Sequence, residues 1–193
     1  MNKNNITQEI NSKNLIQSST LLNSITNQYT PFFGTLLGLH RDGDVIEGDD
    51  DVDYLAPSEL YGDIKQLFLA NGYTLTQFDV SDVFTQFKTT IDSVEVLIDF
   101  YYYIDYNEDY VIDKWNFFGQ YYNTSKWMAI PKPYLFDFKP IQYKGTSISM
   151  ASDPESICKY LYGERYSEPL SKKTQYDMTI VNNMPKIIYK NEK

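Results

Sequence analysis

The chain between Gly34 and Asp53 reads GTLLGLHRDGDVIEGDDDVD, and this stretch decides the fold and the site that we predict. It ends in two aspartates, Asp51 and Asp53, which are spaced i, i+2. In an extended strand their side chains project to the same face, with Cα atoms roughly 6.6 Å apart. Mg²⁺ prefers oxygen ligands in near-octahedral geometry and keeps places for water and substrate phosphates. The spacing therefore predicts a metal site at one end of a strand.

Gly34 and Thr35 predict a phosphate-binding turn beside this carboxylate pair. Glycine lets the backbone approach a phosphate closely. Thr35 offers a hydroxyl at the N-terminus of a short helix over residues 36–40, where unpaired N–H groups attract anions. We therefore expect phosphate on one side of the site and metal on the other.

The aspartate run has two ordinary alternatives, a solvated loop and a calcium loop. An EF-hand that starts at Asp49 has Tyr54 where Gly is needed and Leu60 where Glu is needed. One that starts at Asp42 has Ile46 at the third ligand position. The pattern thus argues against an EF-hand, while the solvated loop stays open.

A third acid, Asp99, lies in the apolar stretch VEVLIDFYYY over Val94–Tyr103. This stretch has the composition of a strand that is buried on both faces. Burying a carboxylate without a partner costs several kcal/mol, so Asp99 should be paired, hydrogen-bonded or bound to a metal. A purely structural hydrogen bond is the alternative to a catalytic role.

Four blocks, in this order, resemble the LicD/fukutin family: GTLLGLHRDG, DDDVD, the Ile-Asp-Phe of residues 98–100, and LYGERYSEP near the C-terminus. The resemblance spans roughly residues 28–169. It implies an α+β fold of the nucleotidyltransferase type, with a mixed sheet flanked by helices. We expect one domain over residues 1–170 and a polar C-terminal tail over residues 171–193.

The resemblance also implies an activity, namely metal-dependent transfer of phosphocholine or a polyol phosphate from a CDP-activated donor to a cell-surface glycan. Lipopolysaccharide or capsule would be such an acceptor. Asp51, Asp53 and Asp99 match the family's metal-binding and catalytic carboxylates, for Mg²⁺ or alternatively Mn²⁺. Gly34, Thr35 and Arg41 match its phosphate-binding residues. The sequence departs from the family at Gly48, where an aromatic residue often precedes the aspartates.

Two other functions stay open at this point. One is nucleotidyl transfer to a small molecule or a protein on the same fold. The other is a catalytically silent module that binds a nucleotide or a glycan. For the transferase we also expect a partner glycosyltransferase in the same pathway.

Composition argues against several classes of protein. The formal net charge of −9 disfavours nucleic-acid binding, because affinity for a phosphate backbone rests on clustered Lys and Arg. Cys158 is the single cysteine, so no internal disulfide can form. The start MNKNNITQEI lacks an apolar signal region, and the chain has no run of about 18 apolar residues. We therefore expect a cytoplasmic protein without a transmembrane segment.

Periodicity and turn residues predict the elements around these motifs. The expected helices are residues 6–27, covering the sheet, residues 57–70, and a last helix from Asp153 to Gly163. The expected strands are residues 31–33, 51–55, 73–78, 83–91, 94–103, 127–130 and 141–150, the last with a hairpin turn at Lys144-Gly145. We expect residues 104–126 to be loop with short helical pieces.

Overall fold

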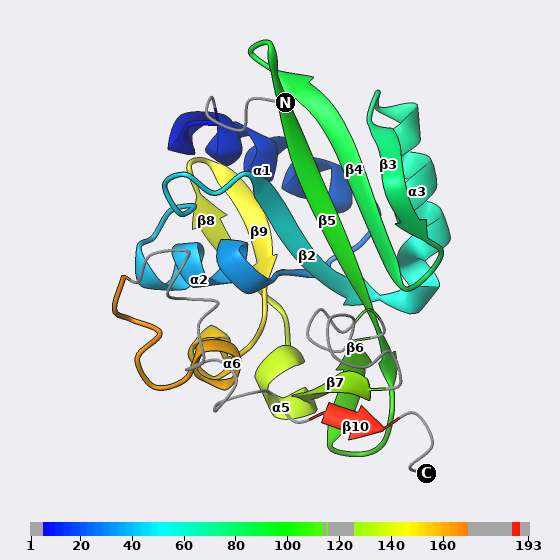
Figure 1. The fold of residues 1–193 in the computed structure, drawn as a ribbon, viewed down its shortest axis with the longest axis vertical. Helices are drawn as coiled ribbons and strands as arrows, with labels where there is room; N and C mark the ends of the chain where they lie inside the picture. The colour runs from blue at the N-terminus through cyan, green and yellow to red at the C-terminus, as the bar shows by residue number, and fades with distance from the viewer. Residues whose placement is uncertain (1–5, 114, 116–125, 170–186, 190–193) are drawn as a thin grey trace.

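The computed structural model describes residues 6–113, 115, 126–169 and 187–189, which form a mixed sheet with helices packed around it (Figure 1). The predicted α+β class is confirmed. The helices are α1 (Gln8–Leu22), α2 (Phe33–Arg41), α3 (Tyr61–Ala70), α5 (Lys132–Leu135) and α6 (Pro154–Tyr162), with a 3-10 helix η2 (Ser58–Leu60). The strands are β1 (Thr30–Pro31), β2 (Asp51–Pro57), β3 (Thr74–Val80), β4 (Phe84–Ile91), β5 (Val94–Asp105), β6 (Tyr110–Asp113), β7 (Lys126–Pro131), β8 (Lys139–Tyr143), β9 (Thr146–Met150) and β10 (Ile187–Tyr189).

The larger sheet is built around the long strand β5. Its strands run in the order β1-β2-β5-β6-β7-β10, with β4 paired to β5 and β3 paired to β4. β2 and β5 are parallel, and the other pairs described in this sheet are antiparallel. β8 and β9 form a separate antiparallel hairpin. Because β2 and β5 run in the same direction, equivalent positions of the two predicted site strands lie side by side.

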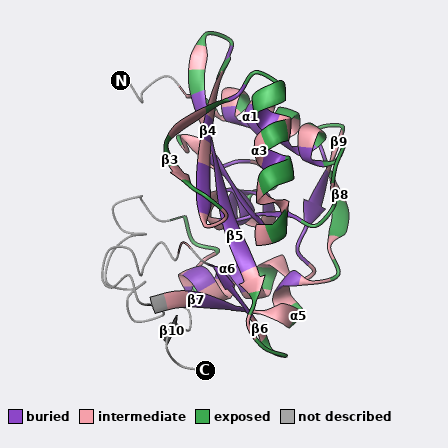
Figure 2. Ribbon diagram, turned by 90° about the vertical axis from the view of Figure 1, so that its right-hand side faces the viewer, coloured by how far each residue is buried: buried purple, intermediate pink, exposed green. Residues whose placement is uncertain are grey.

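Alternation along β2 and β5 divides the sheet into two faces. On one face Tyr54 and Phe100 stack with ring centroids 5.3 Å apart. Helices α1 and α3 lie on the same side of the sheet, and α1 contacts β2, β4 and β5 (Figure 2). The hydroxyls of Ser18 and Ser19 in α1 lie 2.7 and 2.8 Å from the Tyr54 hydroxyl. The expected N-terminal helix thus covers the sheet as predicted, and the opposite face carries the candidate site.

The C-terminal helix α6 has the ends that the sequence predicts. The side chain of Asp153 accepts a hydrogen bond from the Ser156 N–H, and Pro154 opens the first turn. Gly163 follows the last turn with φ +80°, a value that glycine adopts without strain. α6 packs against α2 and α5 and lies below α2 in the view of Figure 1.

The prediction of loop with short helical pieces for residues 104–126 is wrong in the part that the structure describes. β5 continues to Asp105, and β6 turns back on it in an antiparallel pair. Asn107 makes the turn, because its Oδ1 accepts backbone N–H bonds, both at 2.9 Å, from the residues two and three positions later. Residues 114 and 116–125 of this prediction lie outside the described residues.

The predicted polar tail contains at least one strand. Residues 187–189 form β10, which pairs antiparallel with β7. The rest of the predicted tail, apart from these three residues, lies outside the described part of the chain. Among the described residues no helix is both long and apolar enough to cross a membrane.

Candidate active site

Three carboxylates meet on the face of the sheet opposite α1 and α3. The parallel register places Asp53 of β2 beside Asp99 of β5, and Asp51 is two residues earlier on the same face of β2. One carboxylate oxygen of each residue lies within 4.8 Å of the others. Asp53 and Asp99 are each only 7% exposed. The structure therefore brings together the three acids that the sequence predicts, here called the carboxylate trio.

The carboxylate trio is electrostatically unfavourable without a cation. Burial raises the pKa of Asp53 well above its usual range, and the charges of Asp51, Asp99 and Asp49 raise it further, against a backbone hydrogen bond from Gly34. Burial also raises the pKa of Asp99 to about 7, although its hydrogen bond from a glutamine side chain opposes the shift. Like charges held this close favour protonation unless a positive charge lies between them.

The donor set fits a hard divalent cation. The three ligand atoms are all carboxylate oxygens, which suit Mg²⁺ or Mn²⁺. Asp49 and Asp50 extend the acidic region, since Asp49, Asp50 and Asp51 form a second group whose ligand atoms lie within 4.8 Å of one another. The residues present therefore fit the metal that the sequence predicts.

Gly34 has a packing role in the structure, and its predicted role in phosphate binding stays a prediction. It lies inside the first turn of α2, which begins at Phe33. A Cβ atom at Gly34 would lie 2.7 Å from Oδ2 of Asp49. The Asp49 carboxylate therefore lies against the helix backbone at Gly34 and would have to shift if a Cβ atom were added there.

Gly38, four residues later on the same side of α2, has a similar role. A Cβ atom there would lie 2.6 Å from the carbonyl oxygen of Asp44 and 2.9 Å from the backbone nitrogen of Ile46. Both contacts are with residues 42–50, which we call the acidic loop. The two glycines of GTLLG thus let the acidic loop lie directly on α2 and lead into β2 and the carboxylate trio.

Thr35 supports Asp53 through the backbone. Its hydroxyl oxygen accepts a hydrogen bond of 2.9 Å from the Asp53 N–H, and the residue is 1% exposed. The Phe32 N–H donates to the Asp53 carbonyl at 2.9 Å from the same segment. The start of α2 therefore holds both the N–H and the carbonyl of Asp53 through hydrogen bonds.

The structure does not bring Arg41 to the carboxylate trio. Arg41 is the last residue of α2, seven residues and roughly 10.5 Å of helix away from Gly34. Its guanidinium makes a bidentate pair with the neighbouring Asp42, through Nε to Oδ1 at 2.8 Å and Nη2 to Oδ2 at 2.6 Å. This pairing occupies Nε and Nη2, while Nη1 of Arg41 is buried without a hydrogen-bond partner, and phosphate binding by Arg41 stays a prediction.

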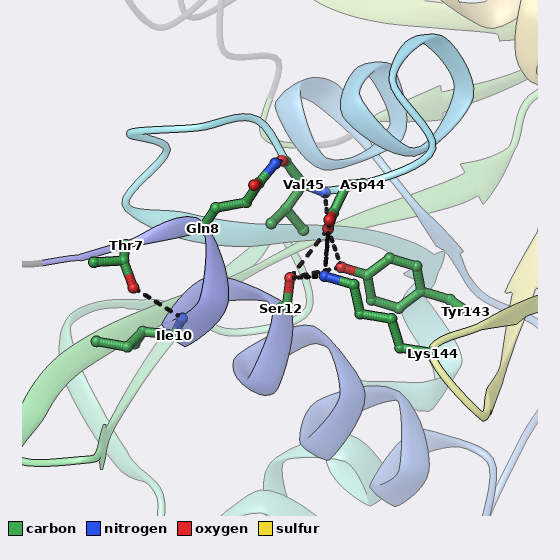
Figure 3. Close-up of polar contacts among 8 residues, drawn as sticks. All are labelled: Thr7, Gln8, Ile10, Ser12, Asp44, Val45, Tyr143 and Lys144. Atoms are coloured by element: carbon green, nitrogen blue, oxygen red, sulfur yellow. Dashed lines mark hydrogen bonds and ion pairs between the residues drawn. The ribbon is translucent and has the colours of Figure 1, made fainter.

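A polar cluster holds the acidic loop against α1 and the β8–β9 hairpin. Figure 3 shows Ser12 of α1, Asp44 of the loop, and Tyr143 and Lys144 of the hairpin pointing toward one another. The Tyr143 hydroxyl donates to Asp44, and Lys144 Nζ lies 2.8 Å from both Oδ2 of Asp44 and Oγ of Ser12. Gln8 adds a 2.8 Å hydrogen bond to the Val45 carbonyl.

Two buried asparagines of α1 hold the strands from the other face. Asn11 Nδ2 donates to the carbonyl of Asp51 at 2.8 Å, and Asn14 Nδ2 donates to the carbonyl of Leu97 at 2.9 Å. Asp51 and Leu97 are opposite each other in the β2–β5 register. The two amides therefore fasten the first residue of β2 and the neighbouring part of β5 to α1.

Sequence reasoning missed several residues around the carboxylate trio. Gln86 of β4 lies opposite Asp99 and donates to its Oδ1 at 2.9 Å. Tyr101, two residues after Asp99, contacts the rings of Phe33 and Phe84 at centroid distances of 4.9 and 5.1 Å. The alternation of the predicted strands contained this signal, because residues paired across an antiparallel ladder share a face. What the sequence lacked was the pairing of those strands.

Comparison with known proteins gives a family and a fold. A family model described as LicD/FKTN/FKRP, nucleotidyltransferase domain, matches residues 27–152. No curated protein matches the sequence.

Two solved structures resemble the fold. The lincosamide antibiotic adenylyltransferase LnuA, bound to lincomycin, is 14% identical with a TM-score of 0.56, covering 89% of this chain and 94% of that one. ANT(2")-Ia in complex with adenylyl-2"-tobramycin is 12% identical with a TM-score of 0.48, covering 89% of this chain and 84% of that one. The first similarity shows a nucleotidyltransferase-like fold, as the sequence predicts.

Proposed function

The chain belongs to the LicD/FKTN/FKRP family, and from this premise we propose that it transfers a phospho-alcohol from a CDP-activated donor to a glycan. Family membership indicates a transferase. The observation that supports the finer proposal is the carboxylate trio, in which two acids are almost fully buried and one oxygen of each acid lies within 4.8 Å of the others. A scaffold without chemistry gains nothing from placing three like charges there.

The carboxylates would hold Mg²⁺ or Mn²⁺ through Asp51, Asp53 and Asp99. When bound, the metal would neutralise the donor diphosphate and the charge that develops in the transition state. The rigid support described above, from Thr35 to the Asp53 backbone and from Gln86 to Asp99, would keep the ligands in place during turnover.

The proposed reaction is an in-line displacement at the phosphorus that carries the alcohol. A hydroxyl oxygen of the acceptor forms a bond to this phosphorus, while the bond to the oxygen shared with the neighbouring phosphate breaks and CMP leaves. We assign the hydroxyl proton to Asp99, the almost fully buried carboxylate of β5 beside Asp53. Phosphocholine, ribitol phosphate and glycerol phosphate are the candidate groups.

The test is CMP release from CDP-choline, CDP-ribitol and CDP-glycerol with Mg²⁺. We expect one donor to be used, and Asp51→Asn and Asp53→Asn to lower the rate roughly 10²-fold or more. Asp63→Asn, at an exposed position of α3, is the matched control and should leave the rate unchanged.

Other results would point to the remaining alternatives. Release of pyrophosphate from CTP or ATP, with the nucleoside monophosphate found on an acceptor, would indicate nucleotidyl transfer. Nucleotide or glycan binding without any turnover would indicate a silent binding module. The glycosyltransferase partner and the cytoplasmic location stay predictions.

A further inference from the structure

A relay of two hydrogen bonds runs from the β3–β4 hairpin to Asp99. The Thr76 hydroxyl donates to Oε1 of Gln86 at 3.0 Å, and Gln86 Nε2 donates to Oδ1 of Asp99 at 2.9 Å. Gln86 is directly opposite Asp99 in the antiparallel β4–β5 register. The three residues come from three adjacent strands, so the relay crosses the sheet toward the carboxylate trio.

The chemistry of the three groups fixes the orientation of the Gln86 amide. An ionised carboxylate only accepts hydrogen bonds, so Asp99 must face the NH₂ group of the amide. The amide oxygen then faces Thr76, whose hydroxyl can donate. A reversed amide would place its oxygen against the carboxylate oxygen, which is unfavourable. The Thr76 hydroxyl therefore donates a hydrogen bond to Gln86, just as the Gln86 amide donates one to Asp99.

The backbone of β3 is adapted to this contact. The β3–β4 pairing is irregular between Leu75 and Asp79, and Thr76 lies within this interval. Thr76 Oγ1 also accepts a hydrogen bond of 3.1 Å from the Phe78 N–H. Such irregularities commonly redirect a side chain beside a functional site. Here the hydroxyl is directed at Gln86.

We propose that Gln86 is a positioning residue for Asp99 and that Thr76 holds Gln86 in the required orientation. Gln86 occupies Oδ1 of Asp99, which leaves the second oxygen to bind the ion and restricts rotation of the carboxylate. The amide is neutral, so it orients Asp99 without cancelling the charge that a cation needs. This inference rests on the metal site of the proposed function.

A role of Gln86 in positioning Asp99 can be distinguished from a role in the stability of the β3–β4 hairpin. A residue that only stabilises the β3–β4 pair would lower the melting temperature when changed and leave metal affinity intact. A residue that orients a metal ligand would lower metal affinity with little change in melting temperature, typically 10–100-fold for such outer partners.

The experiment is a calorimetric titration of the full chain with Mn²⁺ at pH 7.5, together with thermal unfolding. Gln86→Leu removes the donor at similar volume and should weaken Mn²⁺ binding 10-fold or more. Thr76→Val keeps Gln86 and should weaken binding by a smaller factor, while Thr76→Ser restores the hydroxyl and the parent affinity. Thr74→Val is the control, at an exposed position two residues earlier on β3.

The outcomes separate this inference from the proposed function. Parent affinity in both Gln86→Leu and Thr76→Val would overturn the positioning role, even if Asp53→Asn abolishes Mn²⁺ binding. Absence of Mn²⁺ binding by the parent chain would overturn the metal site and, with it, this inference. Equal loss in Thr76→Val and Thr76→Ser would also overturn it, because the hydroxyl would then not be the group that matters.

Discussion

Asp99 is one of the residues whose ionisation opposes folding in the absence of metal. Its pKa is about 7 in the folded protein and 3.8 ordinarily, and burial is the main cause. Between these two values the folded state binds more protons than the unfolded state. The free energy of unfolding therefore falls as pH rises from about 4 to about 8. One pKa unit corresponds to about 1.4 kcal/mol, so the effect is on the order of a few kcal/mol.

We predict that Asp99→Asn stabilises the metal-free protein at pH 8. Asparagine keeps an oxygen that can accept the Gln86 hydrogen bond but carries no charge. The melting temperature should rise by roughly 5 °C at pH 8, and the difference from the parent should vanish near pH 4. Adding Mg²⁺ should stabilise the parent more than the variant, because only the parent keeps all three ligands.

Thermal unfolding at four pH values, with EDTA or with Mg²⁺, checks this prediction. Asp63→Asn serves as the control for the loss of one exposed carboxylate. A lower melting temperature for Asp99→Asn at pH 8 in EDTA would show that Asp99 is held in its charged form by a partner other than a metal.

For single residues, the sequence predicts the position of the three carboxylates better than that of the arginine. Asp51 and Asp53 follow from their spacing, and Asp99 follows from an acid in an apolar strand. Arg41 could not be judged in the same way, because its contact depends on a side-chain conformation. The guanidinium of Arg41 pairs with the adjacent Asp42. No pattern in the sequence indicates this pairing.

Among the elements, α2 and the acidic loop depend on each other. We predict that Gly38→Ala destabilises the protein, because its Cβ would lie 2.6 Å from the backbone oxygen of Asp44 and the loop must move. The cost of such overpacking is about 1–3 kcal/mol, partly offset by the helix propensity of alanine. Because the loop leads into Asp51, Mn²⁺ affinity should fall as well.

Gly62→Ala is the matched control for this substitution. Gly62 is also in a helix, α3, and a Cβ atom there would meet nothing within 4 Å. Alanine should therefore raise stability by roughly 0.5–1 kcal/mol and leave Mn²⁺ binding unchanged. Denaturant unfolding and metal titration of both variants give the comparison. Equal effects at the two glycines would contradict the role assigned to Gly38.

A helix or strand could be predicted from the sequence where residues with local roles mark its ends. α6 was predictable because its start and end are both marked by residues with local roles, Asp153 and Gly163. β6 was missed because only Val111 and Ile112 indicate a strand in a segment rich in Tyr, Asn and Asp. Pairing with β5 supplies the remaining preference, and pairing is not a local property.

For the whole molecule, the site depends on contacts between distant parts of the chain. The polar cluster of Figure 3 joins residues 12, 44, 143 and 144, from α1, the acidic loop and the β8–β9 hairpin. Burial alone would raise the pKa of Asp44, but hydrogen bonds from Lys144, Tyr143 and others outweigh it and lower the pKa. Its stabilising effect is therefore lost as pH falls below about 4, opposite to that of Asp99.

The last prediction concerns Tyr143, a buried member of this cluster. Tyr143→Phe removes the hydroxyl that donates to Asp44 and contacts Ser12 at 2.7 Å, while keeping the ring. We expect a loss of about 1–3 kcal/mol in unfolding free energy, since polar groups lose a buried partner. Hydrogen exchange in residues 42–53 should become faster, and Mn²⁺ affinity should fall because the acidic loop is less well held. Tyr134→Phe, in α5, controls for the loss of a tyrosine hydroxyl. If exchange in the loop stays at the parent rate while stability falls, the cluster supports the hairpin alone, and the site is held by α1 and α2 without it.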